Sequence, residues 1–195
     1  ELAKDSPEHV QLELPLLLFG RWRERFGAED LKRLSQVHLK PVPVTVRQRA
    51  EVTDPGQLHL LPLEGLPWTG DQRMWLCEDP SDFLHSPAFL DGQFYVQDPA
   101  TLLAPTLLAV QPGERCADLC AAPGGKTLIL GEAAGEHGSV LCLDRSWERL
   151  APLRENTAAT CNCHIACGDA ARPPLAPGAF DKILLDVPCS NTGVI

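Results

Sequence analysis

The chain has 195 residues, of which 44% are hydrophobic, enough for one domain with a buried core plus an appendage. Its 17 Lys and Arg against 26 Asp and Glu give a net charge of −9, which argues against a protein whose whole surface binds nucleic acid. The first twenty residues lack the apolar core of a secretory signal, and no stretch reaches the roughly 18 apolar residues of a membrane span. Several of the eight cysteines lie within apolar runs. We therefore expect reduced thiols and a cytoplasmic protein without a membrane segment.

The charge is unevenly distributed. Residues 1–50 carry nine Lys and Arg and seven Asp and Glu, whereas residues 51–195 carry eight and nineteen. The basic residues gather in RWRERF (residues 21–26), at Lys32 and Arg33, and at Arg47 and Arg49. A contact with a polyanion such as RNA would favour this N-terminal part. For RWRER taken alone, a solvated helix face is an equally good interpretation.

The first half of the chain predicts helices and then short strands. Residues 10–38 have helical apolar spacing, with Gly27 ending a first helix and a second running to residue 38. Pro41 and Pro43 break this pattern, and residues 44–52 then alternate like a strand. Two short strands are expected in residues 53–75, another at 92–98, and a helix at 99–109 that has Pro near its start. We expect a helical segment at 1–40 and a small α+β module, similar to RNA-binding modules, at 41–95.

From residue 113 strands and helices alternate. Strands are expected at residues 115–122, 139–145, 163–169 and 180–189, with helices at 127–134 and 147–160 between them. This alternation predicts a parallel sheet with right-handed crossovers, both faces of which are covered by helices. We therefore expect an α/β domain from residue 96 to 195.

A glycine-containing loop, DLCAAPGGK (residues 118–126), follows the first of these strands and opens the first helix. Gly124 and Gly125 would allow the backbone to approach a ligand, and the helix N-terminus would offer N–H groups. A P-loop requires glycine where Cys120 stands, and the dinucleotide fingerprint G-x-G-x-x-G is absent. The two interpretations left are an S-adenosylmethionine (SAM) loop and a structural turn without a ligand.

Three aspartates follow the other strands. Asp144 ends the second strand and suits the hydroxyls of a ribose, Asp169 ends the third and suits an adenine amino group, and Asp186 ends the fourth. The carboxyl ends of parallel strands face one crevice, where open α/β sheets bind ligands. One such aspartate is often a helix cap, but three in series with the glycine loop favour a binding site.

The segment DVPCS (residues 186–190) places Cys189 after the last strand. Amino-group methyltransferases have an aromatic ring at this point, so a thiol indicates a carbon target. Carbon 5 of cytosine becomes nucleophilic only after a thiolate adds to carbon 6. Taken alone, Cys189 is equally explained as a small buried apolar residue.

Together, DLCAAPGGKT, VLCLDR, CGDA and DVPCSNTGVI resemble, in order and spacing, the RNA 5-cytosine methyltransferases, and most of all the group of the ribosomal RNA small subunit methyltransferase B. YVQDPATLLAP (residues 95–105) also resembles a segment of that group. The resemblance is strong from Gly92 onward and implies a Rossmann-like SAM-dependent methyltransferase fold. It implies an RNA substrate, either ribosomal or transfer RNA, and no metal.

The resemblance also implies a role for each matched residue. The SAM loop would comprise Cys120, Ala121, Ala122, Pro123, Gly124, Gly125 and Lys126. Asp144 would hold the ribose and Asp169 the adenine edge. Asp186 would lie between cofactor and cytosine, with Lys126 near the base, and Cys189 would assist product release.

The family's attacking thiol belongs to a Thr-Cys motif on a later strand, which we expect beyond Ile195. The chain is thus expected to be a fragment with about four strands of the sheet, an open apolar edge at residues 182–186, and no methyl transfer of its own.

Two rival interpretations remain. The string formed by Cys161, Cys163, His164 and Cys167 has the ligand types of a zinc site, but a strand would turn His164 away from Cys163. The other rival is a SAM-fold scaffold that binds RNA without catalysis. A Thr-Cys pair downstream of a further strand would favour the enzyme.

Overall fold

The computed structural model describes residues 6–38, 40, 42–52, 58–160 and 162–189. Pro43–Pro188 form one compact unit, and the described residues up to Val42 belong to another. No helix among the described residues is long and apolar enough to cross a membrane.

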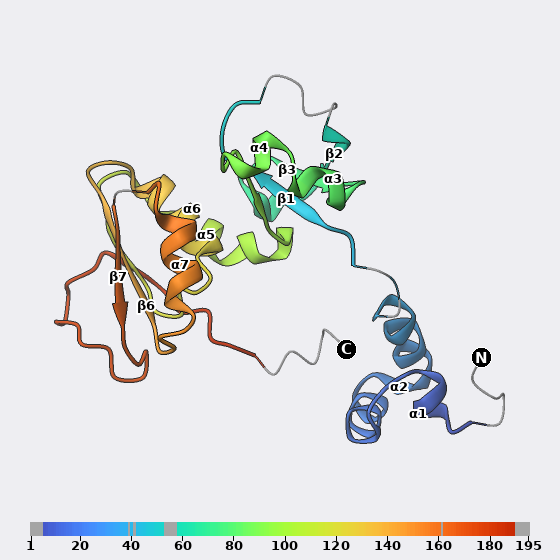
Figure 1. Ribbon diagram of the computed structural model, residues 1–195. Helices are drawn as coiled ribbons and strands as arrows, with labels where there is room; N and C mark the ends of the chain where they lie inside the picture. The colour runs from blue at the N-terminus through green and yellow to red at the C-terminus, as the bar shows by residue number, and fades with distance from the viewer. Residues whose placement is uncertain (1–5, 39, 41, 53–57, 161, 190–195) are drawn as a thin grey trace. The chain divides into compact units, whose positions relative to one another are not determined.

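The N-terminal unit is helical. It contains α1 (Glu8–Gln11) and α2 (Leu16–His38), labelled in Figure 1. Gly27 interrupts α2 with a φ of 79°, a conformation that glycine adopts without the penalty of a side chain. The predicted division at Gly27 is confirmed. Arg23 of the basic stretch binds the Glu8 carboxylate at 2.9 Å across the two helices, on an exposed surface.

The small module, from residue 43, is an antiparallel sheet of four strands in the order β2-β3-β1-β4. The strands are β1 (Thr45–Gln48), β2 (Leu60–Pro62), β3 (Met74–Cys77) and β4 (Phe94–Val96). The 3₁₀ helix η2 (Pro67–Thr69) and the short helices α3 (Pro80–Leu84) and α4 (Pro87–Leu90) complete it. Val46, Phe83 and Phe94 are buried at its centre, with the two rings in edge contact at 5.4 Å.

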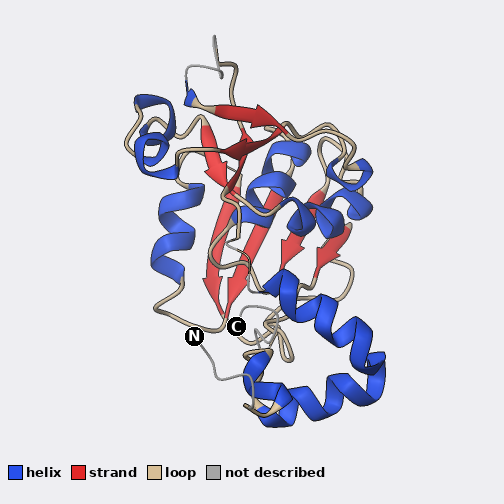
Figure 2. Ribbon diagram, turned by 90° about the vertical axis from the view of Figure 1, so that its right-hand side faces the viewer, coloured by secondary structure: helices blue, strands red, loops and turns tan. Residues whose placement is uncertain are grey.

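The second sheet has four parallel strands in the order β7-β6-β5-β8. They are β5 (Arg115–Asp118), β6 (Ser139–Asp144), β7 (Cys163–Cys167) and β8 (Lys182–Leu184). The helices are α5 (Leu103–Leu108), α6 (Gly125–Ala134) and α7 (Leu150–Thr157), and Figure 2 shows helices packed beside the strands. Their shared core includes Cys116, Leu130, Val140, Cys142 and Leu153. The predicted Rossmann-like α/β fold with about four parallel strands is confirmed.

Some predicted elements differ in detail. The helix expected at 99–109 begins as a 3₁₀ helix, η3 (Pro99–Leu102), before α5. The last strand ends at Leu184, so Asp186 lies two residues beyond it. The expectation that helices cover both faces is wrong for β8, since Ile183 is 49% exposed. β8 is the outermost strand on its side of the described sheet, and it is the open apolar edge that the sequence predicted.

The basic residues Arg47 of β1 and Arg49, just after it, bind a partner within the fold. The Arg47 side chain is 1% exposed, and its guanidinium lies 2.6 Å from the Glu132 carboxylate of α6. It also donates to Gln97 and Gln72 at 3.0 and 2.8 Å. Arg49 contacts the same carboxylate at 2.9 Å. The expectation of a polyanion contact is therefore corrected for Arg47, which is buried, whereas Arg49 shares the single Glu132 carboxylate with it and is 17% exposed.

Replacing Glu132 with Ala should destabilise the protein by about 3 kcal/mol, since it leaves the buried Arg47 charge without its anion. The estimate is at the low end of the range because Glu132 is one-third exposed. Urea unfolding measures the effect. The control is Glu136→Ala, which changes an exposed glutamate in the turn directly after α6. Equal stability of the two variants would contradict the importance of this pair.

Candidate functional site

The carboxyl ends of the parallel strands define a crevice. The chain passes from β5 through β6 to β7 on one side and then returns to β8 on the other side of β5. Such a reversal separates the loops that follow β5 and β8 and opens a ligand site between them. The loop that follows β5 is the predicted SAM loop.

The amide groups of this loop are bound to neighbouring strands. Leu119 N donates to Leu184 O at 3.0 Å, and Ala121 N donates to Leu143 O at 2.9 Å. Ala122 N donates to the Asp144 carboxylate at 3.2 Å, and Cys120 N donates to Asp118 at 3.3 Å. The loop is therefore fixed on β6 and β8, and its first amides are engaged before any ligand binds.

The carbonyls of the loop are held from the opposite side by α7. Arg149 donates to Ala122 O at 2.5 Å, and Asn156 donates to Pro123 O at 2.8 Å. These two side chains are seven residues apart, which places them on one face of a helix. Neither was identified from the sequence, because no local pattern distinguishes them from other polar residues of an amphipathic helix.

The two glycines serve the packing of the protein itself. Gly124 has a φ of 115°, and a Cβ there would lie 3.1 Å from Leu153 of α7. A Cβ on Gly125 would lie 3.0 Å from the Tyr95 ring of β4. Both glycines thus allow α7 and the small module to approach the loop, and their predicted part in holding a ligand stays a prediction. No side chain caps the N-terminus of α6.

Three of the ten predicted cofactor residues, Cys120, Asp144 and Asp169, line one cavity. A cavity of about 470 Å³ is lined by Leu119, Cys120, Asp144, Arg145, Ser146, Arg149, Asp169, Ala170, Ala171, Val187 and Pro188. Lys126 and Asp186 form an ion pair of 2.6 Å at the start of α6. Within the loop, Ala121 and Ala122 are buried and Pro123 is exposed. Cys189 is exposed and lies outside the compact unit that holds this cavity.

The aspartates have different environments. Asp144 is buried and also accepts from Ser146 N at 3.0 Å, with the Arg149 guanidinium 3.5 Å away. Asp169 is exposed, and it accepts from Ala171 N at 3.0 Å. Asp144 is thus both a wall of the cavity and a structural anchor of the loop, whereas Asp169 leaves more of its carboxylate available to a ligand.

Asp118 is a functional candidate that sequence reasoning missed. It is 1% exposed at the end of β5 and accepts from the Thr127 hydroxyl at 2.7 Å. Burial raises the pKa of this carboxyl to about 6, although Thr127, the Cys120 amide and Lys126 act to lower it. The only sequence signal was its position at the end of the strand, where the loop at residues 118–126 begins.

The zinc interpretation receives no support from the described residues. Cys161 lies outside them, and His164 is exposed. The thiols of Cys142 and Cys163, on neighbouring strands, are joined by a hydrogen bond. This hydrogen bond, together with burial, raises the pKa of Cys142. Within the described parts of the chain no three His, Cys, Asp or Glu side chains are grouped to hold a metal ion.

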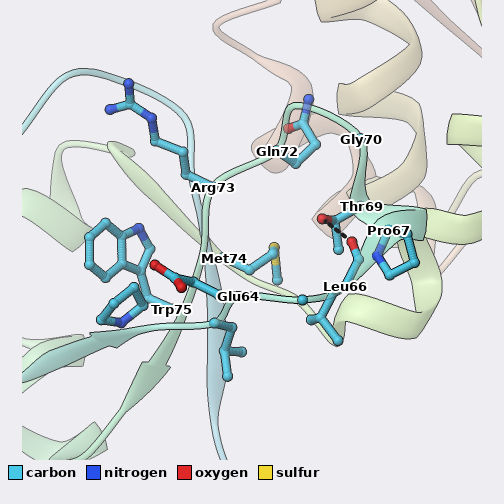
Figure 3. A pocket seen from close by; sticks show the side chains of 12 residues that line it. Glu64, Leu66, Pro67, Thr69, Gly70, Gln72, Arg73, Met74 and Trp75 are labelled. Atoms are coloured by element: carbon cyan, nitrogen blue, oxygen red, sulfur yellow. Dashed lines mark hydrogen bonds between the residues drawn. The ribbon is translucent and has the colours of Figure 1, made fainter.

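A second cavity, of about 540 Å³, belongs to the small module alone (Figure 3). Figure 3 shows Trp75, Arg73, Glu64 and Met74 on its walls, and the Thr69 hydroxyl bonded to Leu66 O at 2.9 Å. None of the predicted site residues lines it. Its larger volume does not make it the candidate site, since its walls lack a cluster of partnered carboxylates.

Comparison with known proteins agrees with the geometry. Residues 105–195 match the family described as 16S rRNA methyltransferase RsmB/F. The chain is similar to that family over this stretch. The ribosomal RNA small subunit methyltransferase B of Vibrio cholerae is 45% identical over 124 residues, covering 62% of this chain and 28% of the relative. A human 28S rRNA (cytosine(4447)-C(5))-methyltransferase is 31% identical over 189 residues, covering 91% of this chain and 23% of the relative.

A solved structure shares the fold. A methyltransferase homolog protein from Pyrococcus horikoshii superposes with a TM-score of 0.76 and 27% identity over 95% of this chain and 63% of that one. The chain spans only about a quarter of the length of the two curated RsmB/F relatives described above.

The stability of this domain should depend on the ionisation of Asp118. Its folded pKa of about 6 exceeds the ordinary value of 3.8, so the fold binds the proton more tightly than the unfolded chain does. The stabilisation is fully present below pH 3.8 and is lost as the pH rises through about 6. Relative to Asp118→Asn, the wild-type free energy of unfolding should fall by about 2–3 kcal/mol between pH 4 and pH 7. A pH-independent difference between the two proteins, measured by urea unfolding, would refute this.

Proposed function

We propose that this chain binds SAM in the cavity at the β5–β8 crevice and contributes the cofactor half of an RNA cytosine-5 methyltransferase. The observation that carries the proposal is the convergence of Cys120, Asp144 and Asp169 on that cavity, beside the Lys126–Asp186 pair. The family match covers the same residues. Both curated relatives above are named as methyltransferases of ribosomal RNA.

The donor and acceptor groups of the site fit SAM. Its ribose hydroxyls need acceptors, its sulfonium and ammonium need negative charge, and its carboxylate needs N–H donors. Asp144 and Asp169 provide acceptors on the cavity wall, and the uncapped N-terminus of α6 provides donors for a carboxylate. When bound, SAM would supply an electrophilic methyl group.

The Lys126–Asp186 pair would act on the target base. Asp186 is half exposed, so its carboxylate remains accessible beside the ammonium that holds it in place. Such a pair can present a carboxylate and a cation to a cytosine edge, which carries both an amino group and ring acceptors. Lys126 and Asp186 would thus orient the base, and Cys189 would assist release of the methylated product.

Cys120 is a poor candidate for the attacking thiol. Burial raises its pKa, and the charges of Asp118, Asp144 and Asp186 raise it further. A thiol attacks as the thiolate, which these surroundings disfavour. The chain also contains the pair Thr160-Cys161. Cys161 lies outside the described residues.

The partner of this site would be RNA, with ribosomal RNA favoured over transfer RNA by the names of the relatives. Because Arg47 is buried against Glu132, the exposed basic residues that could contact a phosphate backbone include those at residues 21–25 and Lys32 and Arg33. Such an enzyme would work in the cytoplasm, where its described cysteines would remain thiols.

SAM affinity provides the direct test. Asp144→Asn should weaken SAM binding by about tenfold or more, since it removes a charged acceptor from the cavity wall. Isothermal titration calorimetry measures the affinity. Asp181→Asn is the matched control, because Asp181 is also a partnered carboxylate but lies beside Arg115 at the amino end of β5. A wild-type chain that binds no SAM, or equal affinities in the two variants, would contradict the proposal.

Cys189 can be tested in a preparation of the protein that is competent to methylate RNA. With Cys189→Ala, a covalent protein–RNA adduct should accumulate and survive a denaturing gel, because the product is no longer released. Cys189→Ser and the wild-type protein are run beside it. Complete loss of the adduct in Cys189→Ala would instead make Cys189 the attacking thiol.

A further inference from the structure

One row of side chains on the small module contacts α6. Met74, Arg47 and Tyr95 stand directly opposite one another on β3, β1 and β4. Direct cross-strand partners project from the same face of a sheet. These three residues, called here the three-residue row, therefore form a line across the module.

The three-residue row meets one face of α6. Met74 packs against Ile129, and Arg47 forms an ion pair with Glu132. The Tyr95 ring lies 3.0 Å from the position that a Cβ on Gly125 would take. Positions 125, 129 and 132 are spaced by four and three residues, which places them on a single helical stripe. The row thus supports α6 along two turns, from its first residue to Glu132.

Tyr95 also reaches the cofactor loop itself. Asn156 of α7 donates to the Tyr95 hydroxyl at 3.3 Å and to Pro123 O at 2.8 Å. One amide group therefore joins β4, α7 and the loop. Removing the Tyr95 hydroxyl would leave the amide with a single acceptor and free it to turn away from Pro123.

From this geometry we infer that Tyr95 and Asn156 are positioning residues for the cofactor, through which the small module sets the loop at residues 119–124 and the start of α6. The inference rests on the proposed SAM site and assigns these residues an indirect role: neither lines the cavity. In this arrangement the module is part of the cofactor-binding machinery as well as a candidate RNA contact.

The test compares Tyr95→Phe with Trp75→Phe in the complete chain. Tyr95→Phe keeps the ring on Gly125 and removes only the hydroxyl. Trp75→Phe removes a similar bond, from Trp75 Nε1 to Gln48 at 3.0 Å, and its residue stands opposite Val46, on the other face of the sheet. Both variants should lose comparable stability, so stability alone does not separate them.

SAM affinity and amide exchange do separate them. Tyr95→Phe should weaken SAM binding by about three- to tenfold, the effect of one lost hydrogen bond, while Trp75→Phe leaves it unchanged. Amide protons of residues 119–128 should exchange faster in Tyr95→Phe without SAM, because the loop and the first turn of α6 open more often. Combining Tyr95→Phe with Asn156→Ala should weaken binding no more than Asn156→Ala alone, as expected for one shared relay.

The outcomes distinguish this inference from the proposed function. Unchanged loop exchange in Tyr95→Phe, equal SAM affinity in the two variants, or additive effects in the double variant would overturn the positioning role. If the wild-type chain bound no SAM while loop protection was still lost in Tyr95→Phe, the proposed function would fail, and only the coupling of the small module to the loop would stand.

Discussion

The hydrogen bond from the Ala122 amide to the buried Asp144 carboxylate is the contact on which the rest of the site depends. It joins the loop after β5 to the end of β6, and Arg149 reinforces it from α7 by binding the carbonyl of the same residue. A carboxylate that accepts a backbone bond in a buried place is strongly oriented. Asp144 can therefore present its remaining lone pairs to a ligand in one direction, which a free surface aspartate cannot do.

The electrostatics of the site follow from crowding carboxylates at one sheet edge. Asp118, Asp144 and Asp186 lie close enough to act on the thiol of Cys120, whose pKa they raise. Asp118 itself holds its proton up to about pH 6 because it is buried. A cationic ligand suits such a site, since each positive charge relieves repulsion between the carboxylates. SAM, with a sulfonium and an ammonium, is a cation of this kind.

The parts of this structure that the sequence predicted are those that local patterns determine. Apolar runs separated by helical periods predicted β5 to β8, and Gly27 predicted the break in α2, because a single glycine is enough to end a helix. The contacts of Arg47, Arg149 and Asn156 could not be predicted in this way. The bonds from Arg47 to Glu132, from Arg149 to Ala122 and from Asn156 to Pro123 span 85, 27 and 33 positions in the chain, and nothing in the neighbouring sequence indicates the partner. The close packing of Gly124 against α7 and of Gly125 against β4 could not be predicted either, because Leu153 and Tyr95 lie far from them in the sequence.

These long-range contacts give the small module a role in positioning α6 and α7. Arg47 and Tyr95 are neighbours across two strands, yet one binds a carboxylate on α6 and the other accepts from α7. A buried charge with several hydrogen bonds has few alternative arrangements, so it fixes the orientation of the elements that it joins. The buried basic residue of the module, Arg47, therefore serves to hold α6 through Glu132. The same contacts that remove Arg47 from any RNA surface make the start of α6, and with it the cofactor loop, depend on the module being folded.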